Sequence, residues 1–319
     1  MIRSARYHWK HQIGDILMII VTGANGRLGR AVTERLLERV PAEEIGVSVR
    51  DVDAARDLGA RGIRVRRGDF ADPSSLAHAF EGASQVLIVS TDATGETALR
   101  AHRTAVDAAA AAGAGRILYT SHMGAHPASP FGPMPDHAAT EAALRASGVP
   151  FTALRNGFYA SSAVMLLGAA LDTGELVAPE DGPVAWTDHA DLADAAVLAL
   201  TTGGDDLDGR TPALTGPEAI DLAGIAALVT RLTGRPIRRV VVSDADYRAR
   251  LLAHGLPEAR ADLLVGLFAA SRRGDFAPAD PTLARLLGRP AVTLADVLTA
   301  TVAPVAALRR SGRGGPASG

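Results

Sequence analysis

Short apolar runs alternate with segments of helical periodicity through the first half of this chain, and no other feature constrains its fold as strongly. The apolar runs, which we expect to form strands, are Met18–Thr22, Ile45–Val49, Ile63–Val65, Gln85–Ser90, Arg116–Ser121 and Phe151–Leu154. The segments that carry apolar residues at helical spacing are Leu28–Leu37, Pro73–Phe80, Thr97–Ala112 and Asp136–Ala146. Strand–helix alternation gives a parallel sheet with helices on both faces. The sequence therefore predicts an α/β fold in which residues 18–158 form a Rossmann-type, doubly wound domain.

After Tyr159 the pattern changes to helices that are interrupted by short strand candidates. Helical spacing recurs in Ile220–Leu232, Asp246–His254, Pro257–Ser271 and Leu294–Val302, and the strand candidates lie near Leu176, Val184 and Val240. We expect residues 159–303 to form a smaller, mostly helical lobe on the substrate side, with some segments returning to the Rossmann sheet. Residues 1–17 have no clear period, and we expect a disordered extension, or a product of start-site choice before Met18. We expect residues 304–319 to be a flexible tail.

A glycine-rich loop, Thr22-Gly-Ala-Asn-Gly-Arg-Leu-Gly29, follows the first expected strand directly. Glycines at this spacing between a strand and a helix are the fingerprint of a dinucleotide-binding turn. Gly23 permits the tight turn, Gly26 lets backbone amides approach the pyrophosphate, and Gly29 lets the helix pack on the strand. The amino end of the helix then supplies N–H donors for the phosphates. We expect the following loop residues to bind the cofactor: Gly23, Asn25, Gly26, Arg27, Leu28 and Gly29.

The residues after the second strand favour NADP(H) over NAD(H). An acidic residue about 20 positions beyond the glycine loop holds the ribose 2′-hydroxyl, whereas an arginine accommodates a 2′-phosphate. Arg50 comes first at this place, and with Arg27 it could clamp that phosphate. Asp51 would repel the phosphate if it pointed inward; its alternative role is to start a helix before Ala54.

Other strand ends supply further candidates for cofactor binding. Asp69 and Phe70 follow the third strand and could border the adenine, or could be a turn followed by a core aromatic residue. Ser90 ends the fourth strand, where it is placed to touch the cofactor. The carboxyl ends of parallel strands meet at one edge of the sheet, so we expect these residues to lie near the glycine loop.

Composition excludes several classes of function. The chain has no cysteine, which excludes disulfides, thiolate metal sites and cysteine nucleophiles. The formal net charge of −2 gives no basic field for nucleic acid or anionic lipid, and no apolar run approaches the roughly 20 residues of a membrane span. We expect a cytoplasmic protein that binds a small molecule and has no nucleic-acid, membrane or metal partner. The sequence is also compatible with a homo-oligomer.

Several motifs together resemble the NmrA-like group of atypical short-chain dehydrogenases. Within that group the pattern is most similar to the bacterial type-2 NAD(P)H:quinone oxidoreductases, whose relatives include triphenylmethane reductase. The similarity runs from Met18 to about Ala303 and is carried by the glycine loop, Ser48-Val-Arg50, Arg67-Gly-Asp-Phe70, Tyr119-Thr-Ser121, His137 with Glu141, and Leu154-Arg-Asn-Gly-Phe-Tyr159. The resemblance implies an NADPH-binding Rossmann domain and a small C-terminal domain that closes over the nicotinamide.

Lys10 is the only lysine in the sequence. A catalytic mechanism that needs a lysine elsewhere is therefore excluded. Ordinary short-chain dehydrogenases use a tyrosine acid with a lysine four residues later, and those positions look like His137 and Glu141 here. Hydride transfer to a simple ketone leaves a basic alkoxide that needs a proton donor. Hydride transfer to a quinone leaves a phenolate-like anion, with a pKa of roughly 10, and transfer to a triarylmethyl cation needs no proton. The sequence thus favours strongly electrophilic acceptors and catalysis by positioning.

Three residues are candidates for catalysis. His137 is a candidate auxiliary acid, because histidine titrates near neutral pH; the alternative is a surface histidine at a helix start. Ser121 could bond the nicotinamide ribose or a quinone oxygen, or could be a strand-end turn residue. Asn156 could orient the carboxamide, or could form a turn.

Residues after the sixth strand and after the fifth strand shape the expected substrate pocket. Phe158 and Tyr159 could floor an aromatic pocket, or could belong to the core. Residues 129–135 contain three prolines, and we expect a mobile loop over the site. His122 and His126 are four residues apart, but the sequence around them indicates a loop and not a metal-binding helix.

These features favour an NADPH-dependent oxidoreductase that transfers hydride to a quinone or a similar conjugated acceptor. The alternative is a non-catalytic NADP(H)-binding redox sensor of the NmrA type, which would use the same glycine loop. The first half of the chain does not separate the two.

Overall fold

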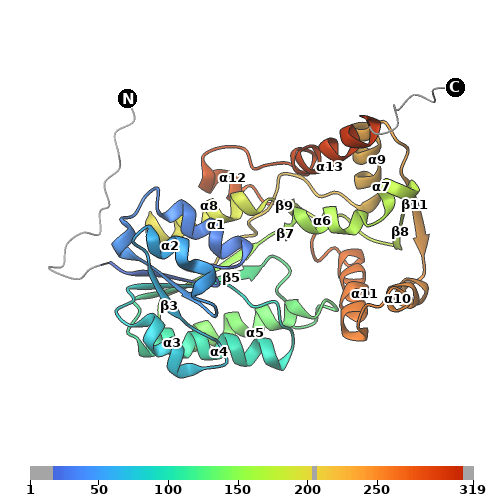
Figure 1. Ribbon diagram of the computed structural model, residues 1–319. Helices are drawn as coiled ribbons and strands as arrows, with labels where there is room; N and C mark the ends of the chain where they lie inside the picture. Colours follow the sequence, from blue (N-terminus) through green and yellow to red (C-terminus); the bar gives the residue numbers. More distant parts are fainter. Residues whose placement is uncertain (1–16, 203–206, 312–319) are drawn as a thin grey trace.

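A parallel sheet lies at the centre of the computed structural model, which describes residues 17–202 and 207–311 (Figure 1). Within these ranges, seven strands form the sheet in the order β10-β6-β5-β4-β1-β2-β3, and every neighbouring pair is parallel. The strands are β1 (Ile19–Thr22), β2 (Ile45–Val49), β3 (Arg64–Arg67), β4 (Gln85–Ile88), β5 (Arg116–His122), β6 (Phe151–Asn156) and β10 (Gly209–Arg210). The predicted Rossmann-type α/β fold is confirmed.

The direction of strand addition reverses beside β1. The chain runs outward from β1 through β2 to β3, then crosses to β4 on the other side of β1 and continues through β5 and β6. Ligands of open parallel sheets bind at such a switch point, beyond the carboxyl ends of the strands. The loop that begins at Gly23 lies at this place.

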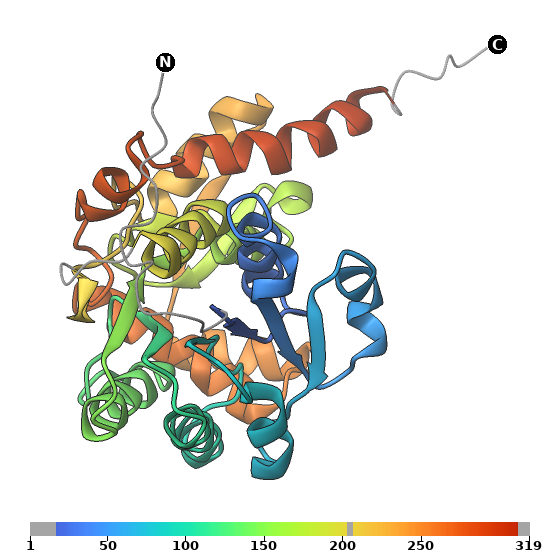
Figure 2. The ribbon, with the colours of Figure 1, turned by 90° about the vertical axis from the view of Figure 1, so that its left-hand side faces the viewer.

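Helices cover both faces of the sheet, as Figure 2 shows. One face carries α1 (Arg27–Leu36), α2 (Arg56–Ala60), α8 (His189–Thr201) and two 3₁₀ turns, η1 (Ala42–Glu44) and η2 (Asp53–Ala55). The other face carries α3 (Pro73–Phe80), α4 (Glu96–Ala111) and α5 (Pro133–Ala146). Side chains of a strand alternate between faces, and β1 shows this: Ile19 and Val21 pack in the first core, and Ile20 packs in the second.

A smaller lobe is built around its own apolar core. Its helices are α6 (Ala160–Leu167), α7 (Ala170–Thr173), α9 (Leu222–Thr233), α10 (Asp244–Ala253), α11 (Glu258–Arg272) and α13 (Leu294–Ser311). Two small parallel sheets join it, one made of β8 (Glu175–Pro179) and β11 (Arg238–Val242), the other of β7 (Phe158–Tyr159) and β9 (Trp186–Thr187). Three segments from this half of the chain lie on the Rossmann side instead: α8 and α12 (Thr282–Leu287) pack together, and β10 extends the main sheet.

Two expected boundaries are wrong. We expected a tail from residue 304, but α13 continues to Ser311, because alanine, leucine and arginine in this stretch are strong helix formers. We expected the loop after β5 to reach Pro135, but α5 begins at Pro133, since proline is well suited to the first helical turn. Leu17 packs partly against the core, whereas residues 1–16 and 312–319 of the two expected extensions lie outside the described residues.

Candidate functional site

The loop after β1 has the geometry of a phosphate-binding turn. Gly23 has a φ of 64°, its N–H donates to the Ser48 carbonyl at 3.0 Å, and its own carbonyl accepts from the Gly26 N–H at 2.9 Å. A Cβ at Gly29 would overlap that carbonyl oxygen, so only glycine lets α1 pack this closely on the loop. No side chain of the described residues caps the amino end of α1, and its first turn carries no acidic residue. The first N–H groups of α1 are therefore available to an anion.

Two other loop residues that we expected to bind cofactor have structural contacts. The Leu28 side chain is buried in the core, so only its backbone can face a ligand. The Asn25 side chain donates to the backbone carbonyl of Asp51 at 2.7 Å. Asn25 thereby ties the glycine loop to the end of β2.

Two guanidinium groups flank this loop without an ion-pair partner among the described residues. Arg27 begins α1, Arg50 follows β2, and both side chains are exposed. The Asp51 carboxylate is bonded to the backbone: its Oδ1 accepts from the N–H groups of Asp53 and Ala54, at 3.0 and 3.3 Å. The alternative role of Asp51, to start the helical turn η2, is the one that the structure shows.

The segments that follow β3 and β4 lie on either side of β1. The predicted site residues in them also make contacts that stabilise the fold. Asp69 Oδ1 accepts from the N–H of Ala71 at 3.0 Å, and Phe70 is half-buried against the core beneath α3. Ser90 donates its backbone N–H to Thr120 Oγ1 at 2.8 Å and accepts from the same hydroxyl at 3.1 Å. These bonds fix the loop after β4 to β5.

Helix α5 places His137 beside a buried tyrosine of β5. The Tyr119 hydroxyl lies 2.7 Å from His137 Nδ1 and 3.4 Å from Nδ1 of His102, which comes from α4. His102 Nδ1 also lies 3.0 Å from Thr140 Oγ1, and its Nε2 accepts from the N–H of Thr91 at 3.0 Å. A hydrogen-bonded network therefore connects the loop after β4 to His137.

Burial keeps this network uncharged. Burial lowers the pKa of His102 to about 4 and raises the pKa of the Tyr119 hydroxyl above its ordinary value. Burial, with smaller contributions from His122 and His102, holds the pKa of His137 well below 6.5. All three groups are neutral at pH 7.

The next turn of α5 carries Glu141, at the position that the resemblance assigns to the lysine of ordinary short-chain dehydrogenases. Glu141 is 3% exposed and accepts from Arg155 at 2.9 and 2.7 Å, with Arg210 at 3.8 Å. The Ser121 hydroxyl donates to Glu141 Oε1 at 2.6 Å. Because this bond uses the only proton of the hydroxyl, Ser121 can accept a further hydrogen bond but cannot donate one.

Phe158 lies at the centre of an aromatic wall and is itself buried in the core of the smaller lobe. Its ring centroid is 5.1 Å from that of Phe276, 5.5 Å from Trp186 and 5.8 Å from Phe131. The His122 ring packs edge-on against Phe158 at 5.3 Å and stacks with His137 at 6.1 Å. Burial lowers the pKa of His122 to about 3, so it is a neutral part of this wall.

Asn156 and Tyr159 frame the other side of the sixth strand end. Asn156 is 2% exposed, and its Oδ1 has no partner within the described residues. The Tyr159 ring lies 4.1 Å from that of His189, centroid to centroid. Burial lowers the pKa of His189 to about 4, and the nearby charge of Arg27 acts in the same direction. Tyr159 and His189 therefore lie close to the glycine loop.

The loop between β5 and α5 is tied to the smaller lobe. Ser129 Oγ donates to Asp275 Oδ2 at 2.9 Å, and Arg273 donates to the Ala128 carbonyl at 2.7 Å. Phe131 from this loop and Phe276 from the lobe pack at 6.0 Å. The two parts of the chain thus build the aromatic wall together.

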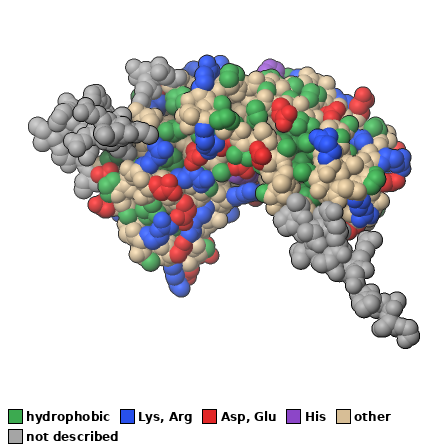
Figure 3. All heavy atoms as spheres, turned by 90° about the horizontal axis from the view of Figure 1, so that it is seen from above, with side chains coloured by type: hydrophobic (Ala, Val, Ile, Leu, Met, Phe, Trp, Pro, Cys, Tyr) green, Lys and Arg blue, Asp and Glu red, His purple; other side chains and the backbone are tan. Residues whose placement is uncertain are grey.

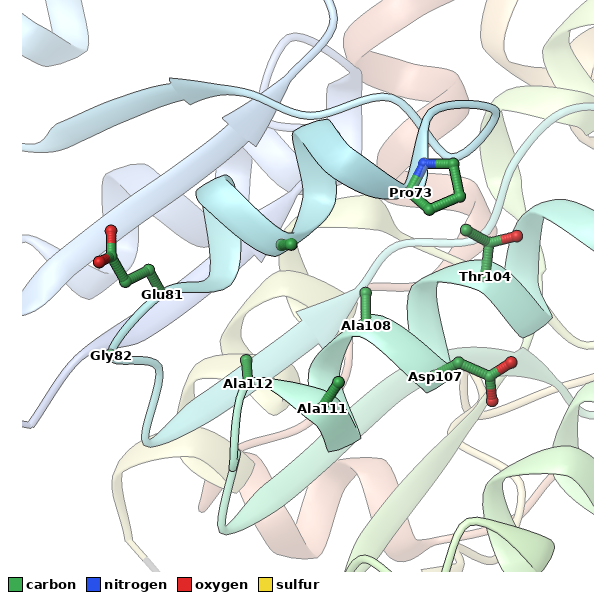
Figure 4. A pocket seen from close by; sticks show the side chains of 9 residues that line it. Pro73, Glu81, Gly82, Thr104, Asp107, Ala108, Ala111 and Ala112 are labelled. Atoms are coloured by element: carbon green, nitrogen blue, oxygen red, sulfur yellow. The ribbon is translucent and has the colours of Figure 1, made fainter.

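Other surfaces do not involve the predicted site residues. A groove of about 570 Å³ lies between α3 and α4 and is lined mainly by small side chains (Figure 4). The face in Figure 3 mixes basic, acidic and hydrophobic side chains. In the described part of the chain, no helix could span a membrane, and no three His, Asp or Glu side chains form a metal-binding group.

Comparison with known proteins identifies the family. A family model described as NAD(P)H-binding matches residues 23–203. The chain belongs to this NAD(P)H-binding family. The family resemblance given by the sequence motifs is confirmed.

Several relatives of this NAD(P)H-binding chain are similar over most of their length. It is 37% identical to quinone oxidoreductase 2 of Escherichia coli, over 88% of this chain and 96% of that protein. The solved complex of the E. coli NADPH-dependent quinone oxidoreductase with NADPH matches with a TM-score of 0.84, covering 89% of this chain and 99% of that one. Triphenylmethane reductase of Citrobacter sp., solved with NADP(H), is 30% identical with a TM-score of 0.81 and covers 89% and 100%. NmrA, a negative transcriptional regulator, shares the fold at 18% identity and a TM-score of 0.70.

Sequence reasoning missed Tyr119, His102 and Phe276 as parts of the site. A signal for Tyr119 existed, because alternate residues of a strand share a face and Tyr119 lies two positions before Ser121. His137 and Glu141 likewise share one face of α5. No local signal marks His102 or Phe276, since each reaches the site through tertiary packing.

Proposed function

We propose that this chain is an NADPH-dependent oxidoreductase that transfers a hydride to a quinone or a similar electrophilic acceptor. The observation that carries the proposal is the state of α5. Glu141 is held by Arg155 in an ion pair, and His137 is neutral beside Tyr119. Neither residue supplies the positive charge that would lower the pKa of a catalytic tyrosine. The site therefore suits acceptors that need no strong acid.

The residues around α1 fit NADPH. The free N–H groups of the helix start and the close packing that Gly29 permits suit a pyrophosphate. Arg27 and Arg50 are exposed and without a protein ion-pair partner in the described ranges, and the Asp51 carboxylate accepts from the backbone of η2. This arrangement supports a preference for the 2′-phosphate of NADP(H) over the 2′-hydroxyl of NAD(H).

The chain's own residues would position the acceptor. When bound, NADPH supplies a hydride from its nicotinamide ring. Phe158, Phe276 and Trp186 are buried in the core of the smaller lobe. The partly exposed rings of the same cluster, Phe131, His122 and His137, are the ones that a planar conjugated molecule would meet. Ser121 can accept a hydrogen bond from a ribose hydroxyl, because its own proton is given to Glu141. Quinone reduction takes up the hydride and one proton from water to give the hydroquinone.

The second candidate, a non-catalytic sensor, has weaker support. Likeness to NmrA is confined to the fold, whereas relatives that are 30% or more identical over most of this chain include a quinone oxidoreductase and a triphenylmethane reductase.

NADPH oxidation against a panel of acceptors tests the proposal. Quinones and triarylmethane dyes should be reduced, and simple ketones should not, with NADPH binding measured in parallel. Binding without turnover of any acceptor would favour the sensor. Efficient reduction of simple ketones would contradict the argument from α5.

A further inference from the structure

The hydrogen bonds around Tyr119 indicate which atom of each pair is the donor and which is the acceptor. We propose that Tyr119 is a positioning residue that holds neutral His137 in the tautomer with its proton on Nε2. The Nε2–H group is then a hydrogen-bond donor for the oxygen or nitrogen atom of the acceptor. This inference rests on the proposed function, because the reducible acceptor is the partner that Nε2–H would meet.

The assignment begins at the loop after β4. The backbone N–H of Thr91 can only donate, so His102 Nε2, 3.0 Å away, carries no proton. His102 is neutral, and its single proton is therefore on Nδ1. That proton points to Thr140 Oγ1 at 3.0 Å, with the Tyr119 oxygen further away at 3.4 Å.

The Tyr119 hydroxyl has one close acceptor, His137 Nδ1. The hydroxyl cannot donate to His102 Nδ1, because that nitrogen is itself protonated. The closest hydrogen-bond partner of the hydroxyl is His137 Nδ1, at 2.7 Å, and Thr140 also contacts this hydroxyl. Thr140 is the weaker acceptor, because its Oγ1 already accepts from His102 Nδ1–H, and its own proton goes to the Asp136 carbonyl at 2.8 Å. Tyr119 therefore donates to His137 Nδ1, and the proton of His137 is on Nε2.

The other nitrogen of His137 is free to meet a ligand. His137 is half-buried, and its Nε2 has no hydrogen-bond partner within residues 17–202 and 207–311. The ring stacks with that of His122 at 6.1 Å, and His122 packs against Phe158 in the aromatic wall. The donor thus lies beside the partly exposed ring of His122, next to which we place the acceptor.

A neutral donor suits the chemistry of an electrophilic acceptor. The oxygen of a quinone gains negative charge as the hydride arrives, and an N–H donor fixed in place stabilises that charge without giving up its proton. The proton that completes the hydroquinone comes from water. Tyr119 acts through His137 and does not touch the acceptor.

Nitrogen NMR of the histidine rings tests this assignment in the full chain. In the ¹⁵N-labelled wild type, we expect His137 to show a pyrrole-type Nε2 and a pyridine-type Nδ1, with the His137→Gln variant identifying its signals among the nine histidines. Tyr119→Phe should convert His137 to a mixture of tautomers and lower quinone turnover about tenfold, with NADPH affinity unchanged. Tyr247→Phe is the matched control, because Tyr247 packs against Phe268 in the smaller lobe. It should change neither measurement.

Two outcomes would overturn the inference. One is a protonated Nδ1 of His137 in the wild type, which needs no variant to detect. The other is loss of turnover in Tyr119→Phe while the His137 signals stay those of the wild type, which would give Tyr119 a merely structural role. A wild type with the expected tautomer and no turnover of any acceptor would instead defeat the proposed function, so the two failures are distinguishable.

Discussion

The start of α1 and the face of α5 that meets β5 lie at the same edge of the sheet but treat their polar groups in opposite ways. At α1 the N–H groups of the first turn and the guanidiniums of Arg27 and Arg50 have no protein partner among the described residues. On α5, Glu141 is enclosed by Arg155 and Ser121, and His137 is bonded to Tyr119.

This difference assigns a separate role to each region: the polar groups at α1 bind a ligand, and those on α5 stabilise the fold. Unpartnered exposed charges cost little to maintain and are ready for a ligand's phosphate. Buried charges persist only where they are paired, and removing one partner leaves the other uncompensated. Changes at α1 should therefore alter cofactor binding, and changes on α5 should alter stability or turnover.

The largest expected effect is on α5. Glu141→Ala should lower the free energy of unfolding by about 3 kcal/mol, because the Arg155 guanidinium loses its carboxylate in a largely buried place. Denaturant titration measures this loss. The matched control is Glu258→Ala, whose ion pair with Arg248 is exposed and should contribute less than about 0.5 kcal/mol. Equal losses in the two variants would contradict a structural role for the α5 pair.

The second effect is a dependence of stability on pH. The folded-state pKa of His102 is about 4, below its ordinary value of 6.5. Above pH 7 neither state binds the proton; as the pH falls from about 6.5 toward 4, the unfolded chain binds it and the folded protein does not, so stability falls by up to about 3 kcal/mol. His102→Gln, which can still accept from Thr91, should reduce this slope by the contribution of one proton in unfolding curves measured across the range. The contributions of His122, His137 and His189, whose pKa values burial also lowers, should remain. An unchanged slope would show that His102 is not the group concerned.

The third effect concerns the start of α1. Arg50→Ala should weaken NADPH about tenfold or more and leave NADH nearly unchanged, because a charge-assisted bond to the 2′-phosphate is lost. Titration calorimetry with both nucleotides measures this, and the free energy of unfolding should not change. Arg145→Ala, an exposed arginine of α5, is the control and should affect neither nucleotide. Equal weakening of NADPH and NADH would contradict the phosphate argument.

The smallest effect is at Ser121. Ser121→Ala should lower stability by about 1 kcal/mol, since one hydrogen bond to Glu141 is lost while both contacts from Arg155 remain. Thermal unfolding is sensitive enough to detect it. A loss as large as that of Glu141→Ala would mean that the hydroxyl, and not the guanidinium, holds the carboxylate.

Local patterns in the sequence were sufficient for six of the seven strands of the sheet, the helices between them and the glycine loop, but not for β10. Gly23, Gly26 and Gly29 act through backbone geometry, which depends on neighbours in the chain and is readable from spacing. The contacts of Glu141 with Arg155, and of Tyr119 with His102, join residues from different strands and helices. Helical period alone places such residues on a face but does not say which partner faces them. The end of α13 was misjudged for a local reason, because glycine and serine near Ser311 obscured the helix formers before them.

The central claim is that this chain reduces electrophilic acceptors without an ionisable acid in the site. Rapid mixing of the NADPH-bound protein with a benzoquinone, from about pH 5.5 to about 8.5, tests it most directly. His137 faces Tyr119 and His122 and follows Asp136, and it stays neutral across this range, so we predict a rate of NADPH oxidation that does not change with pH. A rate that rises on acidification through an apparent pKa of about 6.5 would show that a protonated histidine supplies the proton, and would contradict the account.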